Sequence, residues 1–251
     1  MKETRIMKVF EQYLKKFDMN KGNVKAMYFH SIKMMELCKS IASNINTFNE
    51  EEVIVCGLIG LFHNIGMFSN SQKSCITDYE DTDKSKETID LLFETEKLMR
   101  KITDDTKYDD IIKIAIYCQN KTGLPDGFDN KTKEYCMVLK DALVIERFRM
   151  ITNYPYMDMY IDHYPSDSVY EDFKQFKTIY PNEKNNDADK ILTVMSQIFA
   201  LYYSYSYTLL KNEASVNKLI DALKISNKGI NKFFHQIATV LNMYIERKIN
   251  N

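Results

Sequence analysis

The stretch 54-IVCGLIGLFHNIGMF-68 decides how this chain can be interpreted. Its apolar run ends abruptly in His63 and Asn64. Because the run has no polar side to turn toward solvent, we expect a buried helix over residues 53–62. A buried imidazole beside a buried amide is costly unless each has a partner. The end of this helix should therefore hold a metal, a ligand or a hydrogen-bond partner.

The residues before the run predict where its helix begins. Asn49 can accept a backbone hydrogen bond as an N-cap. The three glutamates that follow, Glu50, Glu51 and Glu52, favour the positive end of a helix dipole. We therefore expect the helix to begin directly after Asn49.

Two further helices each turn one polar side chain inward. Over about residues 23–45, apolar residues recur every three or four positions, and His30 lies on the same stripe. Over about residues 131–150, Asp141 adjoins the apolar stripe of another helix. His30, His63 and Asp141 are therefore the candidates for a polar site inside a helical core.

Composition sets the limits of the fold. The 251 residues include 45% hydrophobic residues but only 7 Gly and 4 Pro, which predicts a mostly helical protein with one large core. No internal repeat or interdomain linker is visible. We expect a single helical domain over residues 1–251, with a core at about 23–150 and a helical extension at about 151–251.

Charge and cysteine content indicate which binding partners and which cellular compartment to expect. Lys+Arg 34 against Asp+Glu 35 leaves a formal charge of -1, which gives no support to nucleic-acid or anionic-membrane binding. No apolar run approaches the ~20 residues that span a bilayer, so we expect no membrane insertion. The cysteines are far apart and form no CxxC pair, as expected for reduced core thiols of a cytoplasmic protein. They are Cys38, Cys56, Cys75, Cys118 and Cys136.

A tyrosine cluster, 201-LYYSYSYTLL-210, favours packing over base stacking. Tyr202 and Tyr205 fit the core stripe of a helix expected over residues 191–209. This would leave Tyr203 and Tyr207 exposed or at an interface, which is compatible with a homo-oligomer.

These features resemble the HD-domain superfamily. His30 in 30-HSIKMMELCKSIA-42, His63 in 61-LFHNIGMF-68 and Asp141 in 138-VLKDALVIERF-148 follow the H…HD…D order of that family. The tail resembles the C-terminal part of a bacterial branch of predicted HD hydrolases. The resemblance implies an all-α, HD-domain-like helical bundle with an additional C-terminal helical subregion.

The resemblance also implies a metal-dependent phosphohydrolase, in which two His and two Asp hold a divalent cation that activates water. His30, His63 and Asp141 carry over as metal ligands. Asn64 stands where the family has its paired Asp, so Asn64 and Asp141 take the positions expected to be catalytic. An amide oxygen is neutral and cannot take a proton from the attacking water, so metal affinity and turnover should both fall.

Other positions depart from that branch. Lys84 and Gln119 stand where histidines would hold a second metal, so we expect either one divalent metal ion or none. Lys84 could instead place an ammonium where a cation lies in relatives. Lys84, Gln119 and Arg147 are therefore the candidates to bind a phosphate or to support the site. His163 and His235 lie outside the motif order and are not expected to be ligands.

Two hypotheses follow. The first is a degenerate HD-domain protein, a pseudoenzyme that has lost turnover and binds a phosphorylated small molecule or a protein partner. The second is an active mononuclear metal-dependent phosphohydrolase that acts on a nucleotide or another phosphoester.

Overall fold

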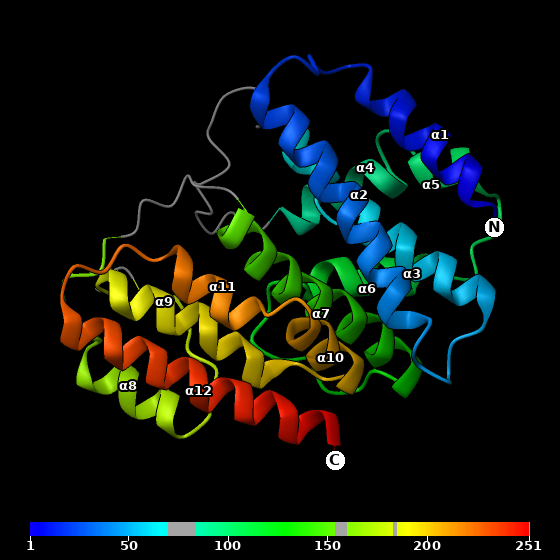
Figure 1. The fold of residues 1–251 in the computed structure, drawn as a ribbon. Helices are drawn as coiled ribbons and strands as arrows, with labels where there is room; N and C mark the ends of the chain where they lie inside the picture. The colour runs from blue at the N-terminus through cyan, green and yellow to red at the C-terminus, as the bar shows by residue number, and fades with distance from the viewer. Residues whose placement is uncertain (70–83, 154–159, 183–184, 251) are drawn as a thin grey trace. The chain divides into compact units, whose positions relative to one another are not determined.

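The computed structural model describes residues 1–69, 84–153, 160–182 and 185–250. Over these ranges the chain is helical and contains no strand, which confirms the all-α fold (Figure 1). The chain divides into two compact units, Met1–Ala142 and Leu143–Asn251, and each is described by itself. The expectation of one domain stays a prediction.

The first unit contains seven α-helices and one 3₁₀ helix among its described residues, the last α-helix continuing into the second unit. They are α1 (Glu3–Leu14), α2 (Gly22–Ala42), α3 (Glu50–Phe62), η1 (Ile65–Ser69), α4 (Ser85–Phe93), α5 (Leu98–Ile102), α6 (Asp109–Cys118) and α7 (Asn130–Asn153). The predicted helices over residues 23–45, 53–62 and 131–150 thus appear as α2, α3 and α7.

The start of α3 is fixed by a capping box. The Asn49 side chain accepts a hydrogen bond from the Glu52 amide at 3.0 Å, and the Glu52 carboxylate accepts one from the Asn49 amide at 2.9 Å. Two amides that would lack helical partners are satisfied in this way. The N-cap expected at Asn49 is confirmed.

Two glycines let α2 and α3 approach each other closely. A Cβ on Gly60 would lie 2.5 Å from the Met34 carbonyl oxygen, and a Cβ on Gly57 would lie 2.6 Å from Cγ of Lys39. Residue numbers fall along α2 as they rise along α3, so the two helices are antiparallel at this crossing. A larger residue at position 60 would force the two backbones apart.

Aromatic packing holds both sides of the turn that follows α3. Phe10 of α1 contacts Phe62 edge-on, with ring centroids 5.5 Å apart, and contacts Phe68 of η1 at 6.1 Å. All three side chains are fully buried. The residues between Phe62 and Phe68 are therefore held against the core at both ends.

The expectation that no apolar run reaches the length of a membrane span needs a correction. Among the described residues, the 20-residue stretch Glu50–Ser69 contains an 18-residue window with a mean hydropathy of 1.5, and it is long and apolar enough to cross a bilayer by those two measures. However, 67% of its most apolar window is buried in the protein, and core helices pass the same test.

The second unit begins within α7, at Leu143, and contains the helices that follow. Among these, α12 packs along α10 and α11 (Figure 1). They are α8 (Asp167–Lys174), α9 (Asp187–Ser196), η2 (Gln197–Ala200), α10 (Ser204–Asn212), α11 (Ser215–Ala222) and α12 (Lys228–Asn250).

The expected tyrosine stripe in this unit is wrong. Tyr202 is 62% exposed, whereas Tyr207 is 3% exposed and its hydroxyl donates to the Leu201 carbonyl at 2.9 Å. The chain leaves the helical conformation between η2 and α10. This break changes the phase of the residues that follow, so a single helical period over residues 191–209 assigns the wrong faces.

Candidate functional site

His30 and His63 lie close together because each is about one helical turn from the point where α2 and α3 cross. His30 lies four residues before Met34, and His63 lies three residues after Gly60, so both side chains project from the same side of the antiparallel crossing. The His30 Nε2 and the His63 Nε2 are 3.3 Å apart. The structure thus brings together two of the residues that the sequence singled out.

The protonation of His63 follows from its surroundings. Its Nδ1 lies 2.7 Å from the Gly60 carbonyl oxygen, which can only accept, so Nδ1 carries the proton. His63 is fully buried, and this burial together with the neighbouring His30 lowers its pKa to about 3. At neutral pH, His63 therefore presents an Nε2 lone pair toward His30, whose own Nε2–H can donate to it.

Gln119, the C-cap residue of α6, contacts the end of α3. The Gln119 Nε2 donates to the His63 carbonyl oxygen at 3.2 Å. That bond fixes the orientation of the amide, since exchanging its oxygen and nitrogen would bring two acceptors together. The Gln119 Oε1 is then buried with no hydrogen-bond partner among the described residues. A buried acceptor of this kind can receive a donor from a bound molecule.

The donor set falls short of what the implied divalent metal needs. Two nitrogens about 3.3 Å apart match one edge of a tetrahedron with Zn–N bonds of about 2.05 Å. Catalytic zinc sites, however, use three protein ligands. Over the described ranges, no group of three or more His, Cys, Asp or Glu side chains could hold a metal ion. The described residues therefore do not fit a divalent metal site.

The other predicted ligands are at different levels of burial. Asp141 is 1% exposed on α7, and Asn64 is half-buried directly after the C-cap of α3, where its carbonyl accepts a hydrogen bond from the Met67 amide at 2.9 Å. Asp141 does not form a three-member metal-binding group with His30 and His63. The roles of Asp141 and Asn64 as metal ligands or catalytic groups stay predictions.

Lys84 lies at the N-cap of α4 and has a carboxylate beside it. Its Nζ is 3.2 Å from the Glu87 Oε2. It lines a surface pocket of about 480 Å³, together with Lys86, Glu87, Asp90, Leu91 and Thr95. The Gly66 amide of η1 donates to the Thr88 hydroxyl of α4 at 3.2 Å. The start of α4 is thereby joined to the segment that follows His63 and Asn64.

The remaining candidates lie in the second unit. Arg147 is half-buried on α7. Its neighbour Arg149 forms a two-pronged ion pair with Glu213, with Nε–Oε2 at 3.0 Å and Nη2–Oε1 at 2.6 Å. Arg149 is therefore already engaged by a carboxylate.

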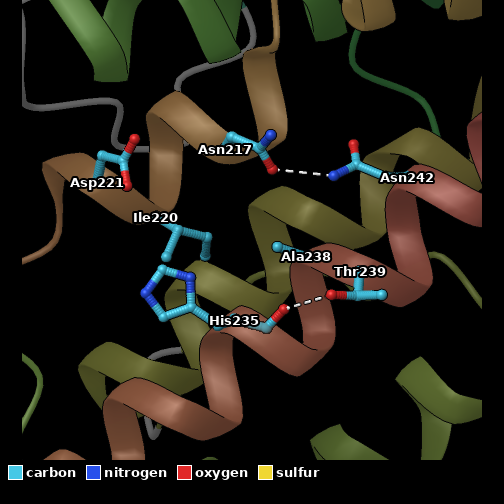
Figure 2. Close-up of a pocket in the computed structure, with 7 residues that line it drawn as sticks. All are labelled: Asn217, Ile220, Asp221, His235, Ala238, Thr239 and Asn242. Atoms are coloured by element: carbon cyan, nitrogen blue, oxygen red, sulfur yellow. Dashed lines mark hydrogen bonds between the residues drawn. The ribbon is translucent and has the colours of Figure 1, made fainter.

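The second unit also carries an open polar pocket of about 360 Å³ between α11 and α12, shown in Figure 2. The Asn242 amide donates to the Asn217 side-chain oxygen across it at 2.9 Å. His235 lines the pocket as an exposed side chain, and the exposed His163 pairs with Asp162. Neither histidine belongs to a metal-binding group among the described residues.

One residue of the site escaped the sequence interpretation. Gly60 supplies both the close helix crossing and the carbonyl that orients His63. A glycine inside a helix costs about 1 kcal/mol relative to alanine, so its presence usually has a packing reason. Gly57 and Gly60 within an apolar helix were the signal that could have identified the crossing.

Comparison with known proteins agrees with the motif order. Residues 27–144 match the family model described as HD domain, a segment that includes His30, His63, Asn64, Gln119 and Asp141. No curated protein and no solved structure matches the chain. HD domains generally bind divalent metals and form a superfamily related to metal-dependent phosphohydrolases. The match therefore supports assigning residues 27–144 of this chain to the HD-domain superfamily.

Proposed function

We propose that this chain is a degenerate HD-domain protein that has lost hydrolytic turnover and binds a phosphorylated small molecule without a catalytic metal. The observation that carries the proposal is the direct approach of His30 and His63, whose Nε2 atoms are 3.3 Å apart. At that distance each nitrogen can be the hydrogen-bond partner of the other. The pair then needs no cation to be satisfied.

The loss of a carboxylate at position 64 supports the absence of turnover. The neutral amide of Asn64 brings no negative charge with which to hold a dication, and Asp141, the acidic candidate, forms no metal-binding group with the two histidines. Hydrolysis also needs a group that takes a proton from water, and an amide cannot do so. His63, with its pKa lowered to about 3 by burial and by His30, is a weak base whose lone pair already faces His30.

The surroundings of Lys84 support a phosphorylated ligand. The pocket of about 480 Å³ lies in the size range of small-molecule sites, roughly 300–1,000 Å³. Lys84 and Lys86 bring two positive charges to it, which the carboxylates of Glu87 and Asp90 in the same pocket balance, and both lysines lie at the amino end of α4, where helix amides favour an anion. A phosphate would compete with Glu87 for the Lys84 ammonium. The buried Gln119 Oε1 can accept a hydrogen bond from a ligand that reaches the end of α3.

The decisive experiment measures metal and ligand binding on the same protein. We expect protein purified without added metal to contain no stoichiometric transition metal by elemental analysis. A panel of nucleotides and sugar phosphates should include a compound that raises the melting temperature equally with and without EDTA. Lys84→Gln should abolish that shift, whereas Lys25→Gln, at an exposed position of α2, should retain it. Metal-dependent hydrolysis that disappears in His63→Ala would contradict the proposal.

The second candidate function is an active mononuclear phosphohydrolase. The Nε2–Nε2 separation of 3.3 Å is equally compatible with this candidate, because it also equals the edge of a tetrahedral metal site, so the distance alone does not distinguish the two functions. This alternative requires a bound metal in stoichiometric amount and hydrolysis of at least one phosphoester in the panel. The absence of both would exclude it.

A further inference from the structure

The polar pocket of the second unit lies between two antiparallel helices, outside residues 27–144 that match the HD-domain model. Asn217 of α11 pairs with Asn242 of α12 at one end of it (Figure 2). Asp221 and His235 lie at the other end, one turn further along α11 and two turns back along α12. At 1.5 Å per residue, the pocket therefore extends roughly 6–10 Å along the helices.

The two asparagines leave a hydrogen-bond donor and an acceptor available at their end of the pocket. The Asn242 amide nitrogen donates to the Asn217 Oδ1 at 2.9 Å, whereas no reverse bond joins the Asn217 nitrogen to the Asn242 oxygen in the described part of the chain. Each carboxamide contains both a donor and an acceptor. The Asn217 amide nitrogen can therefore donate to a bound molecule, and the Asn242 Oδ1 can accept from it.

A second acceptor lies next to Asn242 on the same face of α12. Thr239 lines the pocket three residues before Asn242, and side chains at that spacing are neighbours on a helix. The Thr239 hydroxyl donates to the His235 carbonyl oxygen at 2.9 Å, so only its lone pairs are available to a bound molecule. Two neighbouring acceptors suit the two N–H groups of one amino group.

The charge of the pocket disfavours a phosphate. Its lining residues include a carboxylate, Asp221, but no lysine and no arginine. A carboxylate repels an anion but accepts hydrogen bonds from hydroxyl groups, and the exposed His235 ring can also bond to a hydroxyl. Ile220 and Ala238, both buried, lie between the two polar ends and provide an apolar floor for a flat ring (Figure 2).

We propose that this pocket binds an uncharged nucleoside whose base carries an amino group next to a ring nitrogen, as adenosine and cytidine do. The amino group donates to the Asn242 Oδ1 and the Thr239 Oγ1, and the ring nitrogen accepts from the Asn217 amide. The base lies over the apolar floor, and the ribose hydroxyls donate to Asp221. The volume of about 360 Å³ is within the range of small-molecule sites, roughly 300–1,000 Å³.

Calorimetric titration of the full chain with free nucleosides tests the proposal. The protein carries Lys84→Gln, so that the phosphate site proposed in the first unit does not contribute. We expect one molecule of adenosine or cytidine to bind per chain. Inosine and uridine, in which a carbonyl replaces the amino group, should bind about tenfold more weakly than these counterparts. Binding of neither adenosine nor cytidine, equal binding of the carbonyl analogues, or tighter binding of the 5′-monophosphate would overturn the proposal.

Two variants and a matched control locate the bound nucleoside. Asn217→Ala and Asn242→Ala each remove one carboxamide of the pair, and each should weaken binding about tenfold, the effect of about one lost hydrogen bond. Asn231→Ala removes an exposed asparagine of α12 that does not line the pocket, so it should leave the affinity unchanged. An unchanged affinity in both pocket variants would place the nucleoside elsewhere and refute the site.

Discussion

The Met34 carbonyl oxygen occupies the space that a side chain at position 60 would need. A Cβ built on Gly60 lies 2.5 Å from that oxygen and 2.8 Å from the Cys38 sulfur. This contact sets the distance between α2 and α3. His30 and His63, each about one helical turn from it, are thereby close enough to interact. The histidine pair therefore depends on a residue that has no chemistry of its own.

Gly60→Ala should destabilise the protein and separate the histidines. Because the new methyl group would meet backbone atoms that cannot turn aside, we expect a loss of about 2–3 kcal/mol in the free energy of unfolding. Urea unfolding measures this loss.

Gly57→Ala is the matched control. Its Cβ would meet only Cγ and Cδ of the flexible Lys39 side chain at 2.6 and 2.8 Å and Met35 Cγ at 3.4 Å. Lys39 can move, and alanine favours the helix by about 1 kcal/mol, so this variant should be nearly neutral. Equal losses for the two variants would show that the backbone contact at Gly60 is not what matters.

A double-mutant cycle on His30→Gln and His63→Gln should reveal the contact between the two imidazoles. We expect a coupling of about 1 kcal/mol in unfolding free energy, the usual net value of one hydrogen bond. The cycle is measured in EDTA so that no metal contributes. Lys25→Gln combined with His63→Gln should instead be additive, because Lys25 is exposed on α2. Additivity of the histidine variants would mean that the two rings do not interact in solution.

Stability should fall as the pH drops below the ordinary pKa of histidine. Burial, assisted by His30, lowers the pKa of His63 from 6.5 to about 3. Above pH 6.5 the imidazole is neutral in both the folded and the unfolded chain, so it adds no pH dependence. Between these values only the unfolded chain takes up the proton, and folding loses about 1.4 kcal/mol per pH unit.

The comparison that isolates this effect uses His63→Gln. Between about pH 6.5 and pH 5, the wild-type protein should lose about 2 kcal/mol more than the variant, as measured by urea unfolding at each pH. Parallel pH profiles would indicate that His63 titrates normally and is therefore accessible to solvent in the folded protein.

Asn64→Asp should restore part of a metal site without restoring turnover. A carboxylate at the position directly after His63 would offer an anionic oxygen where the family has its paired Asp, so we expect the affinity for Zn²⁺ or Mn²⁺ to rise about tenfold or more, equivalent to about 1.4 kcal/mol, as measured by calorimetry. Asn64→Ser adds no charge and should bind no better than wild type. Vigorous phosphoester hydrolysis by Asn64→Asp would show that a single carboxylate is all that the site lacks.

Features that depend on local chain chemistry could be predicted from the sequence. The start of α3 follows from Asn49 and Glu52, which satisfy each other's amides within one turn. The inward position of His63 follows from the apolar run before it, and that of Asp141 from the stripe of α7. The order of these residues was enough to indicate the HD-domain superfamily for this part of the chain, which the match over residues 27–144 supports.

Contacts between helices were decided only by the tertiary structure. The Nε2–Nε2 contact of His30 and His63 depends on the crossing at Gly60, and the bond from Gln119 to the His63 carbonyl depends on where α6 ends. In the second unit, Tyr207 is buried on α10, whereas Tyr202 is exposed because it lies in the break that separates η2 from α10. Residue periodicity assigns a face to each helix while the helix continues. Which faces meet, and at what distance, depends on side chains far apart in the sequence that pack only in the folded protein.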